Sequence, residues 1–198
     1  MLQGMLMFNY RGYTDMIKKV TTPLSKDVVQ SLQAGDVVRV SGKIYTARDA
    51  AHKRMVEDLA AGKSLPIDMQ GQVIYYVGPA PAMPGQVIGS AGPTTSGRMD
   101  KYAPTMMQQG MAGMIGKGLR GKEVVEAMQK YGCVYFAAVG GAGAVIAKTI
   151  KAYKVLAYDD LGAEAFAEME VEDFPAIVVI DAHGKDFYQE GTEKYRID

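Results

Sequence analysis

The sequence is poor in the residues that build disulfide frameworks and metal sites. Cys133 is its only cysteine, and its two histidines, His52 and His183, are far apart. One cysteine excludes an internal disulfide framework, and it cannot by itself hold an iron–sulfur cluster, which needs several thiolates. A zinc site made of histidine and cysteine is disfavoured, because the chain has one cysteine and its two histidines are far apart in sequence. Since a lone cysteine suits a reducing compartment, we expect a cytoplasmic protein.

The chain also lacks an excess of either charge and any long apolar run. Lys and Arg number 22, as do Asp and Glu, which disfavours a general nucleic-acid binder or a polybasic membrane anchor. No apolar stretch reaches the roughly 18–20 residues of a membrane span. The apolar start has no basic region before it, so we expect no signal peptide. Instead we expect a tail or extension over about residues 1–20, followed by one domain over residues 21–198.

Strand and helix patterns alternate along the chain. We expect helices over residues 26–32, 47–60, 97–109, 122–131, 144–150 and 163–169, and strands over 37–45, 73–77, 133–139, 154–158 and 176–181. A last short strand is expected after His183 and Gly184, and Gly-rich loops over 78–85 and 113–118. Ser25 and Thr46 are the expected caps of the first two helices. This order predicts an α/β fold whose central strands are covered by helices.

Five methionines gather between residues 99 and 114: Met99, Met106, Met107, Met111 and Met114. Methionine is flexible and apolar, so it fills irregular gaps and adaptable interfaces. We therefore expect a buried or subunit-facing surface there.

A Gly-rich turn at residues 140–143 is followed by a helix, a strand and two aspartates, as in a dinucleotide-binding unit. Ile146, however, stands where the third glycine of G-x-G-x-x-G would be, and a lone G-x-G is a weak signal. We favour a tight structural turn here.

Basic and hydroxyl side chains mark two further places. Arg48 lies at a strand-to-helix junction, where α/β domains place ligands, whereas the following Lys53 and Arg54 are interpreted as a solvated face. The second place is the loop of residues 88–100, with Thr94, Thr95 and Arg98, together with Lys117 from the next Gly-rich loop. Small hydroxyls beside a guanidinium suit a carboxylate or phosphate.

Four segments, residues 41–54, 76–81, 89–100 and 113–118, together resemble the class I fumarases, the iron–sulfur hydro-lyases of the fumarate/tartrate group. The resemblance is to their C-terminal domain, which in some organisms is a separate β subunit. It covers nearly the whole chain after about residue 20. It implies an α/β fold of the swivelling β/β/α type, with a central sheet flanked by helices.

The same resemblance implies a cofactor and a partner. A 4Fe–4S cluster would be held by cysteines of a separate α subunit in an α₂β₂ assembly, and Cys133 would be a core strand residue. The substrate would be a C4 dicarboxylate, with fumarate and L-malate favoured over L-tartrate or mesaconate. The chain alone is expected to be inactive.

Residue by residue, the resemblance implies that Arg48 and Arg98 contact substrate carboxylates. It implies that Thr94 is the catalytic base, with Thr95 as the alternative, and that Lys117 is a catalytic and substrate-binding residue. Two guanidinium groups can grip a dicarboxylate bidentately, and Arg98 with Lys117 would stabilise negative charge in the transition state. Two other classes remain open: a non-catalytic carboxylate-binding module that closes over a partner, and an NAD-dependent oxidoreductase, which rests only on the Gly-rich turn.

Overall fold

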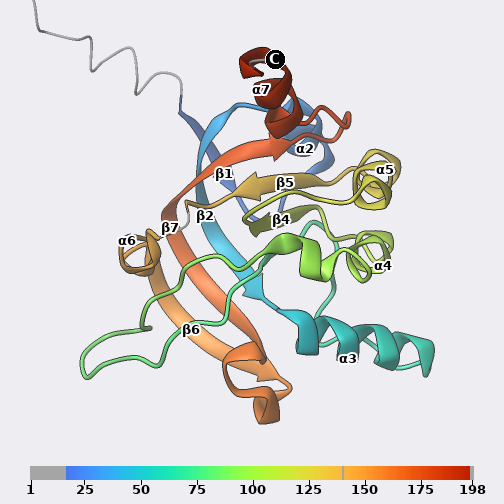
Figure 1. The fold of residues 1–198 in the computed structure, drawn as a ribbon. Helices are drawn as coiled ribbons and strands as arrows, with labels where there is room; N and C mark the ends of the chain where they lie inside the picture. The colour runs from blue at the N-terminus through green and yellow to red at the C-terminus, as the bar shows by residue number, and fades with distance from the viewer. Residues whose placement is uncertain (1–16, 140, 197–198) are drawn as a thin grey trace, which may run out of the picture.

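A seven-stranded mixed sheet forms the centre of the protein in the computed structural model, which describes residues 17–139 and 141–196 (Figure 1). The strands are β1 (Lys18–Thr21), β2 (Val37–Thr46), β3 (Val73–Tyr75), β4 (Gly113–Gly116), β5 (Val134–Ala137), β6 (Ile150–Ala157) and β7 (Phe166–Ile180). Their order is β1-β2-β3-β4-β5-β7-β6, and β1 to β5 are parallel. Strand β7 runs antiparallel to β5, β6 and β2. Because β7 pairs with both β5 and β2, it closes part of the sheet on itself.

Helices flank this sheet, as the sequence predicts. They are α2 (Lys26–Ser31), α3 (Asp49–Ala60), α4 (Ala103–Gln108), α5 (Lys122–Tyr131), α6 (Gly143–Ala147) and α7 (Phe187–Tyr195), with short 3₁₀ turns η1 (Ser96–Met99) and η2 (Asp159–Glu164). Helices α3, α4 and α5 lie along one side, whereas α6 lies on another (Figure 1). None of the helices in the described part of the chain is both long and apolar enough to cross a membrane.

The five methionines are buried, none more than 2% exposed, and they pack with Met55, Phe166 and Tyr135 against α3, α4 and α5. Cys133 is buried in the same cluster. The methionine-rich segment is therefore core in this chain. Of the predicted tail, residues 1–16 lie outside the described residues, and β1 begins at Lys18.

The predicted cap at Ser25 and the predicted helix end at Gly132 are confirmed, whereas the predicted cap at Thr46 is not. Ser25 accepts a hydrogen bond from the Val28 amide at 3.2 Å, and helix α5 ends at Gly132 with a φ of 72°. The prediction that Thr46 caps the next helix is wrong, because Thr46 ends β2 and α3 begins at Asp49. The first turn of α3 is capped from elsewhere: the Ala50 amide donates to Glu164 Oε2 at 3.2 Å.

The helix predicted over residues 163–169 is wrong, because Phe166–Met169 begins the long strand β7. Helix-favouring Ala, Glu and Met are overridden by pairing with β2 on one side and β6 on the other. Phe166 is buried and stacks on Tyr45 of β2 with ring centroids 5.6 Å apart. The alternation of Glu168, Glu170 and Glu172 with apolar residues was the overlooked strand signal.

Three other predicted elements differ. Residues 113–118 are not a Gly-rich turn, because residues 113–116 form the buried strand β4; a Cβ on Gly113 would lie 2.9 Å from Val73 Cγ2, so glycine permits this packing. The helix predicted over 97–109 is divided into η1 and α4. Helix α7 forms where a last short strand is predicted. Asp186 caps its first turn by accepting a hydrogen bond from the Tyr188 amide at 2.9 Å.

Candidate functional site

The candidate site lies where the parallel strands β2, β3 and β4 end. Arg48 follows β2, and Lys117 follows β4. The loop of residues 88–100 returns between them: the Thr94 amide donates to the Tyr76 carbonyl at 2.8 Å, and the Ser96 amide donates to the Lys117 carbonyl at 2.9 Å. Since the carboxyl ends of parallel strands meet at one sheet edge, residues distant in sequence become neighbours there.

The structure brings together both predicted arginines, which meet at Asp49. Arg98 Nε donates to Asp49 Oδ1 at 3.1 Å, and Arg98 Nη2 lies 2.7 Å from Asp49 Oδ2. Arg48 Nη2 lies 3.9 Å from the same Oδ2 and 3.3 Å from Glu164 Oε1. The two guanidinium groups therefore share one carboxylate, and Arg48 contacts a second.

The two arginines differ in their exposure. The side chain of Arg98 is 51% exposed, whereas that of Arg48 is 22% exposed, and the buried Nε of Arg48 has no hydrogen-bond partner among the described residues. Gly78, after β3, lies against Arg48: a Cβ there would be 2.7 Å from Arg48 Nη1. The Arg48 side chain is thus packed closely against Gly78, whereas the Arg98 side chain faces solvent.

Thr94, Thr95 and Lys117 lie together at the same edge. Thr95 and Lys117 form an isolated parallel bridge, and the Lys117 amide donates to the Thr94 carbonyl at 3.3 Å. Thr94 is half-buried, whereas Thr95 and Lys117 are exposed. These contacts are made by backbone atoms. They fix the positions of both threonines and the lysine and do not use the side-chain hydroxyl or ammonium groups.

An ion pair between the buried Arg120 and the half-buried Asp100 joins the loop of residues 88–100 to the residues that follow β4. Arg120 Nε donates to Asp100 Oδ1 at 2.7 Å, and the Gly121 amide donates to Asp100 Oδ2 at 2.7 Å. The Arg120 side chain is 0% exposed and lies over the rings of Tyr76 and Tyr135. Asp100 ends the turn that carries Arg98, so this pair ties the Arg98 loop to the Lys117 loop.

Sequence reasoning missed Asp49, Glu164 and Arg120. The first is adjacent to Arg48 in the same motif, and the third lies close after Lys117, so proximity to predicted site residues was the available signal. Glu164 carried no such signal, because only tertiary structure brings η2 to the start of α3.

His52 contacts the backbone of this edge, whereas the neighbouring cations of α3, Lys53 and Arg54, pair with Glu57 and Asp160 instead. His52 is buried, and its Nδ1 lies 2.9 Å from the Arg48 carbonyl oxygen. Burial lowers the pKa of His52 to about 4, so the ring is neutral near pH 7. Lys53 is exposed, and Arg54 binds Asp160 through two hydrogen bonds of 2.6 and 2.9 Å.

Neither a dinucleotide unit nor a metal cluster fits the described residues. In a dinucleotide-binding β-α-β unit, the two strands are parallel neighbours in the sheet. Here β7 lies between β5 and β6 and runs antiparallel to both, so β5 and β6 do not form such a unit. Within residues 17–139 and 141–196, no three His, Cys, Asp or Glu side chains are grouped to hold a metal ion. Cys133 is fully buried, and this burial raises the pKa of its thiol to about 12, so the thiol is protonated near pH 7.

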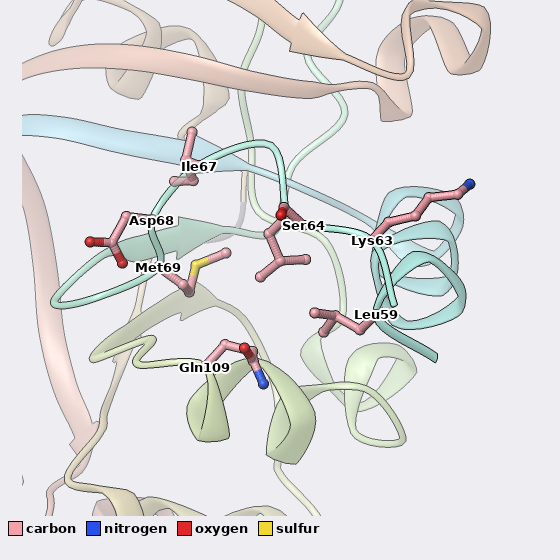
Figure 2. Close-up of a pocket in the computed structure, with 8 residues that line it drawn as sticks. Leu59, Lys63, Ser64, Ile67, Asp68, Met69 and Gln109 are labelled. Atoms are coloured by element: carbon pink, nitrogen blue, oxygen red, sulfur yellow. The ribbon is translucent and has the colours of Figure 1, made fainter. Parts of the chain in front are cut away.

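A pocket of about 460 Å³ lies near the C-terminal end of α3, lined by Leu59, Met69 and Gln109 among others (Figure 2). It is at the opposite end of α3 from Arg48. None of the buried polar atoms without a partner belongs to its lining residues in the described part of the chain. The arginine edge therefore remains the better candidate.

Comparison with known proteins points to one family. The family model described as Fumarase C-terminus matches residues 11–191. The chain is 40% identical over 176 residues to "Fumarate hydratase class I, anaerobic" of Escherichia coli, covering 87% of this chain and 32% of that protein. It is 43% identical over 169 residues to "Fumarate hydratase 1, mitochondrial" of Leishmania major, covering 83% of this chain and 31% of that protein. The chain thus spans about a third of these relatives.

A relative of similar length differs in name. The chain is 40% identical over 177 residues to "Putative L(+)-tartrate dehydratase subunit beta" of Methanocaldococcus jannaschii, covering 86% of this chain and 91% of that protein.

Proposed function

Because the chain belongs to the fumarase C-terminal family, we propose that it supplies the carboxylate-binding part of a hydro-lyase active site. The reaction is the reversible hydration of fumarate to L-malate. The observation that carries this proposal is that Arg48 and Arg98 both reach one carboxylate, Asp49, at the edge where the parallel strands end. A C4 dicarboxylate carries two such groups.

In this proposal the two arginines bind the two substrate carboxylates. Arg48, held between Gly78 and Glu164, provides a fixed anchor. Arg98 is exposed and faces the side from which substrate arrives. Guanidinium groups suit this task because their donors match the two oxygens of a carboxylate.

Thr94 is proposed as the base that takes the proton beside a substrate carboxylate. Its half-buried position between the ends of β3 and β4 supports this choice over the exposed Thr95. Removing that proton places negative charge on the adjacent carboxylate, and Arg98 with Lys117 would stabilise it. Lys117 suits this role because its backbone is joined to the threonine segment.

The described residues do not fit an iron–sulfur cluster, so a partner would hold it. We propose that a separate α subunit provides a 4Fe–4S cluster in an α₂β₂ assembly. The name of the tartrate dehydratase relative, a β subunit of nearly the same extent, supports a two-subunit arrangement. Residues 21–198 would act as one swivelling β/β/α domain that closes the site over the partner.

L-tartrate dehydratase is the second candidate activity. It is favoured by the same relative, which this chain covers over 91% of its length. L-tartrate and L-malate differ by one hydroxyl group, so the same two arginines could bind either.

The test is co-expression of this chain with an α subunit candidate under anaerobic conditions with iron and sulfide. Fumarate formation from L-malate is followed by ultraviolet absorbance, and L-tartrate is tested in parallel. Arg98→Ala should lower kcat/KM at least about 100-fold, because a bidentate charge-assisted pair contributes about 3 kcal/mol. Arg54→Ala is the matched control, since Arg54 also binds an aspartate through two hydrogen bonds.

Malate activity that Arg98→Ala abolishes and Arg54→Ala preserves supports fumarate hydration. Activity on L-tartrate alone supports the second candidate. A complex with an intact cluster that binds dicarboxylates and converts neither would favour a non-catalytic carboxylate-binding module.

A further inference from the structure

Asp49 is the acidic side chain between the two proposed substrate-binding arginines. It is the first residue of α3 and directly follows Arg48. The start of this helix is held by the Ala50 amide, which donates to Glu164 Oε2 at 3.2 Å, and by the His52 amide, which donates to the Arg48 carbonyl at 2.9 Å. With its side chain 27% exposed, Asp49 stands on a fixed backbone at the edge of the site.

Asp49 occupies one edge of the Arg98 guanidinium. Nε and Nη2 of Arg98 lie 3.1 and 2.7 Å from its two carboxylate oxygens. A guanidinium has a second bidentate edge, formed by Nη1 and Nη2. For Arg98 the structure gives Nη1 no partner among the described residues, so this edge remains available to a substrate carboxylate.

The same aspartate also relates Arg98 to Arg48. Arg48 Nη2 lies 3.9 Å from Asp49 Oδ2, and the same nitrogen lies 3.3 Å from Glu164 Oε1. The spacing of the two arginines is therefore set through Asp49. We propose that Asp49 is a positioning residue, which fixes the plane of Arg98 so that its free edge and Arg48 meet the two carboxylates of one substrate.

This proposal rests on the proposed function for the identity of the substrate. It also makes a prediction that a merely structural role would not. The negative charge of Asp49 opposes a dianionic substrate, so Asp49→Asn should leave KM for L-malate unchanged or lower it, by up to about tenfold. Loss of orientation should at the same time lower kcat by about 10- to 100-fold. Arg98→Ala, in contrast, should raise KM.

The test compares Asp49→Asn, Asp49→Glu and Glu57→Gln in the complex with the cluster-bearing subunit. Glu57 is on the same helix and 63% exposed, so Glu57→Gln makes the same change of charge away from the arginines. Asp49→Glu should restore the wild-type KM, because the charge returns, but should leave kcat low, because the carboxylate is displaced. An Asp49→Asn complex with wild-type kcat, or one that changes only by a raised KM, overturns the proposal.

A second measurement is independent of activity. In the chain itself, the Arg98 Nε–H signal in a ¹H–¹⁵N spectrum should show the shift and slow exchange of a carboxylate-bound group, and Arg98→Lys assigns it. Asp49→Asn, or Asp49→Ser where Asn fails to fold, should abolish this signature, and Glu57→Gln should not. An unchanged signal refutes the positioning role. An inactive wild-type complex with the expected spectra would refute the hydro-lyase activity alone.

Discussion

Gly78 provides a test of the proposed role of Arg48 as an anchor for a substrate carboxylate. A methyl group at this position would lie 2.7 Å from Arg48 Nη1 and 3.1 Å from Arg48 Cδ, while ordinary contacts begin at 3.4 Å. The guanidinium of a Gly78→Ala variant must therefore move by about 0.7 Å or more. The carbonyl oxygen of Ala163, 3.3 Å from the same methyl, and the ion pair with Glu164 limit where it can go.

The expected effect on function exceeds the effect on stability. A displacement approaching 1 Å of a substrate-positioning group can cost about 100-fold, so kcat/KM for L-malate should fall by about 10- to 100-fold. The atoms that must move belong mainly to the end of a flexible side chain, so the melting temperature should change by no more than about 4 °C, which corresponds to roughly 1–2 kcal/mol.

The assay is steady-state kinetics of the complex together with thermal unfolding of the variant chain. Gly191→Ala is the control, because among the described residues no atom outside the adjacent backbone of α7 lies within 4 Å of the added methyl group. A Gly78→Ala enzyme with wild-type kinetics would refute the assignment of Arg48 as a substrate anchor. A loss of activity that only parallels unfolding would refute the reasoning from side-chain displacement.

Two further predictions concern the buried groups beneath the site. The pKa of His52 is lowered from 6.5 to about 4, so the unfolded chain binds this proton first as pH falls. Neutral His52 therefore contributes fully to the free energy of unfolding above pH 6.5. This contribution decreases by about 3 kcal/mol as the pH falls towards 4. Urea unfolding should therefore show a steeper acid loss for wild type than for His52→Asn, and equal slopes would contradict the assignment. Asp100→Ala should destabilise the chain by about 3 kcal/mol, because it leaves the buried Arg120 charge unpaired. Arg120→Met should lower the free energy of unfolding less than Asp100→Ala in the same denaturant titration, because it removes the charge itself. A larger loss for Arg120→Met than for Asp100→Ala would disprove this account.

Local signals predicted those elements whose causes are local. Ser25 caps α2 and Gly132 ends α5, because capping and left-handed backbone depend on a few adjacent residues. Elements that depend on distant partners were predicted poorly. Residues 166–169 have the composition of a helix, yet they form β7 because β2 and β6 pair with them. Glycines 113 and 116 suggested a turn, yet they permit close packing in β4.

The sequence by itself determined the family, because its motifs keep their order and chemistry along the chain, and it supplied the residues that we propose for the half-site. It also predicted that Arg48 would lie at a strand-to-helix junction. Only the tertiary structure decided how these residues are held. Asp49 between the two arginines, Glu164 capping α3, and Arg120 under the site loops are contacts made across the fold. Such ion pairs leave no periodicity or local propensity in the sequence, since they exist only once the sheet has brought its strand ends together.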